Sequence, residues 1–182
     1  LRTNREEPDL NHDTMVGFTR EFQAALEISE EAVDLVVDRW MDVEYFHKYI
    51  AVDRALEAND GPLHFFAPGA VGSEYTGAGW NHNYYWYAAF DEPRLWAVPW
   101  DLDLTLGAGI TDSWIQDEWN DLEAPCVLKP NILPFFPPSV APACDPLVRS
   151  LARRQQAYRK VVVALLEGPF SERVVNAKLA RW

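Results

Sequence analysis

Two carboxylates stand one residue apart in an apolar run of the chain. The segment VPWDLDLTLG covers residues 98–107 and places Asp101 and Asp103 among valine, tryptophan and leucine side chains. Burying an unpaired carboxylate is costly, so such charges need compensation. A divalent metal ion is one group that could supply it. The spacing alone leaves an alternative, in which both acids bind backbone N–H groups of a turn.

Three further polar residues are expected near this segment. His82 and Asn83 lead into a predicted hairpin, and Asp101 follows it, so Asn83 and Asp101 should be neighbours if the strands pair in that register. An amide oxygen and a carboxylate are hard ligands that suit Mg²⁺ or Mn²⁺. Asp60, at the predicted end of a helix, could act as a nearby base. A base, a metal-binding Asn and a metal-binding Asp are the parts used in phosphoryl transfer.

The first half of the chain predicts two helices and then a hairpin. Ser29 is a plausible N-cap for a helix reaching residue 40, and a second helix is expected to start at Asp42 and to end at Gly61-Pro62. Hydrophobic residues at helical spacing predict that the second helix buries the stripe Tyr45, Tyr49, Val52 and Leu56. Residues 61–80 are expected to form a loop, and residues 84–88 and 95–98 are expected to pair as strands.

The second half predicts a long irregular segment followed by helices. Residues 108–144 contain many prolines, with Trp114 and Trp119 as expected anchors. Asp145-Pro146 should begin a helix that ends at Gly168. A last helix from Ser171 should bury Val175, Leu179 and Trp182. The order of elements predicts an α+β fold with helices around a central β-hairpin.

Composition limits the partners and the compartment. The chain has 182 residues, begins at Leu1, and is expected to be a fragment of a longer protein. A net charge of −12 argues against nucleic acid and against an anionic membrane surface. No apolar run approaches the roughly 20 residues of a membrane span. Cys126 and Cys144 could form a disulfide in an oxidising compartment or remain two free buried thiols.

The segment HNYYWYAAFDEPRLWAVPWDLDLTLG, residues 82–107, resembles the core signature of the CotH (spore coat protein H) kinase family. The helical segments at 45–60 and 145–167 are similar to the family's flanking helices, so the resemblance covers roughly residues 29–168. It implies an atypical protein-kinase-like fold and phosphate transfer from ATP to protein side chains with Mg²⁺ or Mn²⁺. Some family members are spore-coat or cell-surface proteins, which implies an extracellular or surface location and a protein substrate or surface partner.

The resemblance also implies a role for each acidic residue and for Asn83. Asp60 would act as the base or would position the acceptor hydroxyl, and Asn83 and Asp101 would bind the metal and its nucleotide. Asp103 would be a second metal contact or an acid that holds the loop. Residues 61–80 would be an insertion between Asp60 and Asn83.

The nucleotide-anchoring lobe of a kinase is not apparent in the sequence. No strand ahead of Asp60 carries a lysine, Lys48 lies in a predicted helix, and no GxGxxG segment occurs. We therefore expect residues 1–182 to form a single domain that resembles a C-terminal lobe and is inactive alone.

Two other functions remain open at this point. A protein of the same fold could be catalytically inactive and bind partners at a cell or spore surface. A carboxylate hydrolase could instead pair Asp101 or Asp103 with Glu118, as glycosidases pair two acids. Two clusters are expected to be structural: the aromatic run 84–87 should pack on both faces of its strand, and arginines 149, 153, 154 and 159 should form a solvated helix face.

Overall fold

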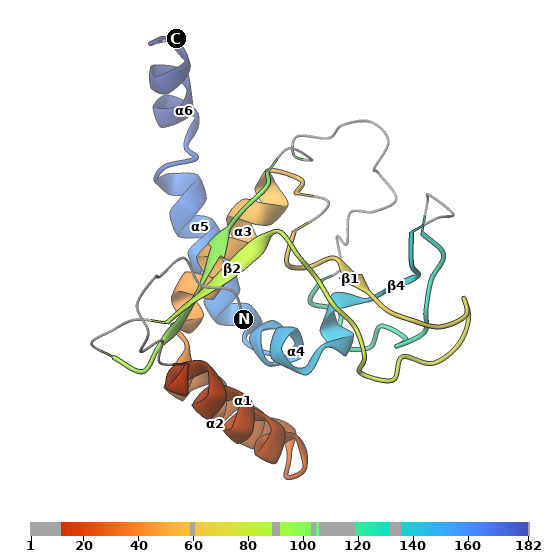
Figure 1. The fold of residues 1–182 in the computed structure, drawn as a ribbon. Helices are drawn as coiled ribbons and strands as arrows, with labels where there is room; N and C mark the ends of the chain where they lie inside the picture. Colours follow the sequence, from red (N-terminus) through yellow and green to blue (C-terminus); the bar gives the residue numbers. More distant parts are fainter. Residues whose placement is uncertain are drawn as a thin grey trace, which may run out of the picture.

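The computed structural model describes residues 12–58, 61–88, 92–102, 105, 119–131 and 136–181. The helices and strands confirm an α+β fold (Figure 1). They follow one another as α1 (Asp13–Leu26), α2 (Glu30–Trp40), α3 (Val43–Ala55), β1 (Phe65–Phe66), β2 (Tyr84–Ala88), β3 (Leu95–Pro99), β4 (Ser139–Val140), the 3₁₀ helix η1 (Pro142–Cys144), α4 (Pro146–Ala152), α5 (Gln155–Glu167) and α6 (Glu172–Leu179).

Side-chain caps define the starts of α2 and α3, as the sequence predicts. Ser29 Oγ accepts a hydrogen bond from the Ala32 N–H at 3.2 Å, and Asp42 Oδ1 accepts one from the Tyr45 N–H at 3.0 Å. Helix α1, which packs along α2, was not predicted. Its N-cap is His12, whose side chain makes no capping hydrogen bond, so the usual start signal is missing.

Helix α3 ends earlier and faces a different way than predicted. It ends at Ala55, and Glu57 then adopts a left-handed conformation with φ of 50°. The buried face carries Phe46, Ile50 and Asp53, so the predicted stripe is shifted by one residue. Tyr45 is partly buried, and its hydroxyl donates to the Ala97 carbonyl oxygen at 2.5 Å.

The β-hairpin is confirmed in place and register. Strands β2 and β3 pair antiparallel, from Tyr84 opposite Pro99 to Ala88 opposite Leu95. One aromatic prediction is wrong, because Tyr85 and Tyr87 are 57% and 50% exposed while their neighbours face the core. The strand is therefore covered on one face only.

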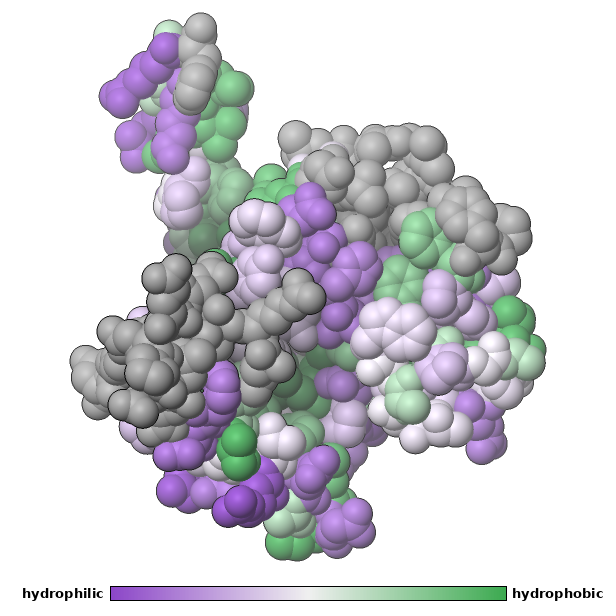
Figure 2. All heavy atoms as spheres, in the orientation of Figure 1, coloured by the Kyte–Doolittle hydropathy of each residue, from purple (hydrophilic) through white to green (hydrophobic). Residues whose placement is uncertain are grey.

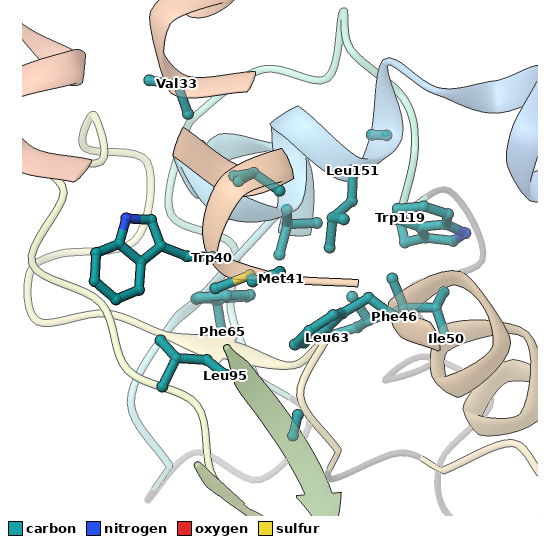
Figure 3. Close-up of a cluster of buried hydrophobic side chains, with 14 of the residues drawn as sticks. Val33, Trp40, Met41, Phe46, Ile50, Leu63, Phe65, Leu95, Trp119 and Leu151 are labelled. Carbon is teal, nitrogen blue, oxygen red and sulfur yellow. The ribbon is translucent and has the colours of Figure 1, made fainter. Parts of the chain in front are cut away.

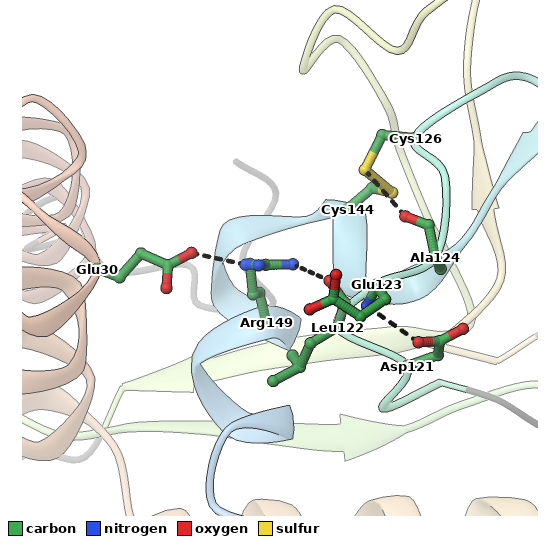
Figure 4. The surroundings of a disulfide bond; sticks show 8 residues. All are labelled: Glu30, Asp121, Leu122, Glu123, Ala124, Cys126, Cys144 and Arg149. Atoms are coloured by element: carbon green, nitrogen blue, oxygen red, sulfur yellow. Dashed lines mark hydrogen bonds and ion pairs between the residues drawn. A yellow bond between two sulfur atoms is a disulfide. The ribbon is translucent and has the colours of Figure 1, made fainter.

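The two segments expected to be irregular pair with each other. Strand β1 lies antiparallel to β4, with Phe65 opposite Val140, and an isolated bridge joins Glu74 to Val127. Cys126 and Cys144 form a disulfide with 5.6 Å between their Cα atoms, which selects the oxidised alternative (Figure 4).

The helix predicted from residue 145 to 168 is two helices, α4 and α5, separated at Arg153-Arg154. Asp145 Oδ1 caps α4 by accepting hydrogen bonds from the N–H groups of Leu147 and Val148, at 2.9 and 3.0 Å. Helix α6 extends away from the other helices (Figure 1), and none of its residues is buried. The prediction that Val175 and Leu179 are inside is wrong, and Trp182 lies outside the described residues. Figure 2 shows hydrophobic residues exposed along one side of this helix.

The core lies where α2, α3, α4 and the hairpin meet (Figure 3). Met41, Leu63 and Leu95 are at most 2% exposed in its centre, and Trp119 is the anchor that the sequence predicts. Trp114 lies outside the described residues. Among the helices of the described ranges, none combines the length and the apolar character that crossing a membrane requires.

Candidate functional site

The two ends of the hairpin place Asn83 beside the segment that carries Asp101. The Trp100 N–H donates to the Asn83 carbonyl oxygen at 2.9 Å, directly after the pairing of Tyr84 with Pro99. Both residues adopt the left-handed conformation, with φ of 63° for Asn83 and 53° for Asp101. Asn and Asp accept this conformation better than other residues with a Cβ atom. The predicted proximity of Asn83 and Asp101 is confirmed.

The two side chains line one narrow cleft, which has room for about one water-sized sphere, a volume of about 10 Å³. Tyr49 and Asp53 from α3 and the segment at Gly61-Pro62 also line this cleft. The amide of Asn83 and the carboxylates of Asp101 and Asp53 line this cleft together with the hydroxyl-bearing Tyr49 and Thr105. The sequence analysis predicted Asn83 and Asp101.

Asp53 is the acidic residue that the sequence analysis missed. Its side chain is 2% exposed, and Oδ2 receives the Arg54 guanidinium at 2.8 Å. Burial raises the pKa of the Asp53 carboxyl, and the Arg54 charge opposes that shift. A Cβ atom on Gly61 would stand 2.5 Å from Asp53 Oδ1, so only glycine fits against this carboxylate. Helical spacing from Phe46 and Ile50 was the signal that could have placed Asp53 on the buried face.

The Asn83 amide has one satisfied end and one unsatisfied end. Its Oδ1 lies 3.0 Å from His82 Nδ1, while its Nδ2 is buried without a hydrogen-bond partner. Rotating the amide by half a turn would place the carbonyl oxygen in the unpaired position and Nδ2 toward the imidazole. The residue can therefore present an oxygen ligand while its other end stays bonded.

These residues fit a divalent metal only in part. Asn83 and Asp101 supply the hard oxygen atoms that Mg²⁺ and Mn²⁺ take. Within the described ranges, however, no three acidic, histidine or cysteine side chains gather closely enough to hold a metal ion. A metal bound here would need other ligands, such as water and phosphate oxygens.

Three predicted acids cannot be placed. Asp60, Asp103 and Glu118 lie outside the described residues. Asp60 directly precedes Gly61, and Asp103 follows Leu102, and both of those neighbours line the cleft. The roles of Asp60 and Asp103, and the pairing with Glu118 in a hydrolase, stay predictions.

The arginines at the end of α4 are not a solvated face. Arg149, Arg153 and Arg154 form ion pairs with acidic residues of α2, at N–O distances from 2.7 to 3.4 Å. Figure 4 shows Arg149 between Glu30 and the Leu122 carbonyl oxygen. We call this group the arginine seam: Arg149, Arg153 and Arg154 with Glu30, Asp34 and Asp38. These three guanidinium groups already bind carboxylates, whereas Arg159 is exposed as predicted.

Comparison with known proteins gives one informative result. Neither the curated proteins nor the solved structures contain a significant match. The family model described as CotH kinase protein matches residues 3–182, a wider range than the 29–168 over which the sequence resemblance was noted. This match indicates a kinase-like function at the level of the family. With its signature hairpin carrying Asn83 and Asp101 to one cleft, the chain belongs to the CotH kinase family.

Proposed function

We propose that this chain contributes the metal-binding half of a site that transfers phosphate from ATP to protein side chains. The observation that carries the proposal is that Asn83, just before the hairpin, and Asp101, just after it, line the same cleft. In kinase sites an Asn and an Asp hold the metal ions that neutralise the phosphate oxygens. In this protein Asn83 and Asp101 would take those two positions.

Backbone conformation supports a functional role for both residues. Non-glycine residues in the left-handed region cost free energy, and such residues concentrate at functional sites. Here Asn83 precedes strand β2 and Asp101 follows strand β3, both at the open end of the hairpin, and the Trp100–Asn83 hydrogen bond fixes their spacing.

The acceptor side of the proposed site rests on Asp60. As a base next to Gly61 it would accept the proton of the acceptor hydroxyl, and Asp103 would contact the metal or hold the loop. We also propose that residues 1–182 form one domain and correspond to the C-terminal lobe of a kinase-like fold. Lys48 supports this assignment, since it lies on α3, pairs with Glu44 at 2.6 Å, and is not among the residues lining the cleft.

Phosphate transfer by the full-length protein tests the proposal. We would measure incorporation of radiolabelled phosphate from ATP into a panel of acceptor proteins, with Mg²⁺ and with Mn²⁺. Asp101→Ala and Asp60→Ala should each lower the rate about 100-fold or more, with Asp103→Ala milder if Asp103 only holds the loop. Glu92→Ala is the matched control, because Glu92 lies between strands β2 and β3, away from Asn83 and Asp101, and this variant should keep full activity.

Two outcomes would contradict the proposal. Full activity in a folded Asp101→Ala protein would exclude the metal assignment. No transfer by the unmutated protein to any acceptor with either metal would favour a protein of this fold that binds surface partners without catalysis. Thermal melts of each variant separate loss of the site from loss of the fold.

A further inference from the structure

A larger cavity lies on the other side of Tyr49 from the proposed site. Helices α1, α3 and α4, the hairpin and residues 62–65 line a partly open cavity of about 210 Å³. Its walls are mostly aromatic and aliphatic, with Phe18, Phe22, Phe46, Trp86 and Leu151 among them. It shares only Tyr49 and Pro62 with the cleft that contains Asn83 and Asp101.

Two polar groups in the cavity wall already have partners. Asn81 Nδ2 donates to the Pro62 carbonyl oxygen at 2.5 Å, and its Oδ1 accepts from the Tyr84 hydroxyl at 2.8 Å. These bonds occupy both ends of the Asn81 amide and hold it in place in the cavity wall. A ligand in the cavity would find its strongest remaining acceptor elsewhere.

Asp145 is that acceptor. Its Oδ1 accepts the two N–H groups that cap α4, and no lysine or arginine of the described ranges forms an ion pair with it. Burial raises the pKa of this carboxyl, as expected for an acid in apolar surroundings without a cation. A carboxylate in an apolar wall with no cation beside it favours a ligand that carries a positive charge.

We propose that this cavity binds a small amphipathic amine, with an apolar body among the aromatic side chains and its ammonium group facing Asp145. The volume sets the size of the body. An apolar cavity of about 150 Å³ holds benzene, so 210 Å³ accommodates one ring with a short chain. Pockets for drug-sized ligands start at about 300 Å³, which excludes a nucleotide. The proposal does not depend on the kinase activity of the neighbouring cleft.

Isothermal titration calorimetry with three matched probes tests this inference. The probes are 2-phenylethylamine, 2-phenylethanol and phenylacetate, which share a ring and differ in charge. The amine should bind at least about tenfold more tightly than the alcohol, because a charged hydrogen bond is stronger than a neutral one. Phenylacetate should not bind measurably, since its charge would face Asp145.

Variants assign the binding to the cavity. Asp145→Asn keeps an N-cap residue but removes the charge. The affinity for the amine should therefore fall to that for the alcohol, while the affinity for the alcohol should not change. Ala97→Leu, at a cavity-wall position that is 2% exposed, should abolish binding of both probes. Asp121→Asn is the matched control, because Asp121 also accepts a backbone N–H, from Glu123 at 2.9 Å, but does not line the cavity.

The comparison among the three probes uses the unmutated chain, so it decides the matter even if a variant does not fold. Equal affinities for all three probes, or no binding of the amine at millimolar concentration, would overturn the proposal. Amine binding that persists unchanged in folded Asp145→Asn would overturn it as well.

Discussion

The arginine seam and the Asn83–Asp101 cleft treat polar groups in opposite ways. In the seam every arginine contacts at least one carboxylate of α2, and Arg154 also donates to the Ser150 carbonyl oxygen at 2.7 Å. In the cleft the Asn83 amide has an unpaired buried nitrogen, and its backbone and that of Asp101 are left-handed. The seam joins α2 to α4 and to the α4–α5 break through paired charges, whereas the cleft combines left-handed backbone with one unsatisfied polar atom.

This difference separates stabilising from functional polar residues better than residue type does. Both regions contain acids beside an apolar core, so residue types alone do not show which region is functional. Only the partners distinguish them, because a group that is already bonded has little left to offer a ligand. The comparison predicts that mutations in the seam change stability, while mutations in the cleft change activity.

The largest expected effect is on the seam. Arg154→Ala removes bonds to Ser150, Asp34 and Asp38. Asp38 loses its ion pair, while Asp34 keeps its pair with Arg153. The seam is partly buried, so we expect a loss of about 2–3 kcal/mol in the free energy of unfolding, between exposed and buried ion pairs. Chemical denaturation would measure it. Arg159→Ala on the exposed face of α5 should change little, and equal effects of both substitutions would contradict the assignment of the seam.

His47 tests whether an unpaired buried atom always marks function. Its Nε2 donates to the Leu151 carbonyl oxygen at 3.1 Å, and its Nδ1 is buried without a partner. Burial lowers the pKa of this imidazole from 6.5, and the Arg154 charge adds to the shift, although the bond to Leu151 opposes it. We interpret this group as structural, because a neutral imidazole needs only one donated bond here.

The sign of the pH effect follows from that lowered pKa. The unfolded chain binds a proton at His47 near pH 6.5 while the folded chain does not, so stability is full above pH 6.5 and falls as the pH drops. Between pH 7.5 and 5.5 the loss should be at most about 1.4 kcal/mol. Denaturation of the wild type and of His47→Gln at both pH values measures it. The variant should show a smaller decrease, and identical decreases would contradict this prediction.

Asp101 should show a smaller effect on stability that depends on backbone conformation. Because its φ is positive, Asp101→Gly should be about 1 kcal/mol more stable than Asp101→Ala. Both variants should lack phosphate transfer. The same pair at Glu92, which is not left-handed, should show the opposite order of stability. Thermal melts of the four proteins provide the measurement, and alanine more stable than glycine at Asp101 would argue against strain.

The smallest expected effect is at Lys48. Its ion pair with Glu44 is exposed on α3, so Lys48→Met should leave stability unchanged within experimental error. Phosphate transfer by the full-length protein should also be unchanged, since the cleft does not include Lys48. A strong loss of transfer in folded Lys48→Met would show that the lysine acts on the nucleotide, contrary to our assignment.

Local signals in the sequence predicted elements that depend on local interactions. Ser29 and Asp145 cap helices as predicted, and a helix begins at Asp42 as predicted, since a cap bonds only to residues two or three positions away. The hairpin was predicted for a similar reason, because short aromatic and apolar strands flank a turn at 91–93. Its register then placed Asn83 near Asp101 without any long-range information.

The parts that were missed depend on tertiary contacts. The face of α3 is set by what packs against it, so spacing alone did not decide between the stripe from Tyr45 and the stripe from Phe46 that brings Asp53 into the cleft. The pairing of β1 with β4 joins residues 65 and 140, and no local sequence pattern predicts this pairing. The exposed face of α6 carries Val175 and Leu179, whose spacing is that of a buried helix. Periodicity shows that a helix has an apolar side, but not what covers it.

The disulfide affects the chain before it has folded. Its two cysteines are 18 residues apart, and closing a loop of this length restricts the unfolded ensemble by about 3 kcal/mol in the chain-entropy view. Strand β4 lies inside that loop, and Asp145 is the first residue after the loop closes at Cys144. An oxidised chain therefore searches fewer conformations before β4 meets β1, and in a reducing compartment this distant pairing would have to form without that advantage.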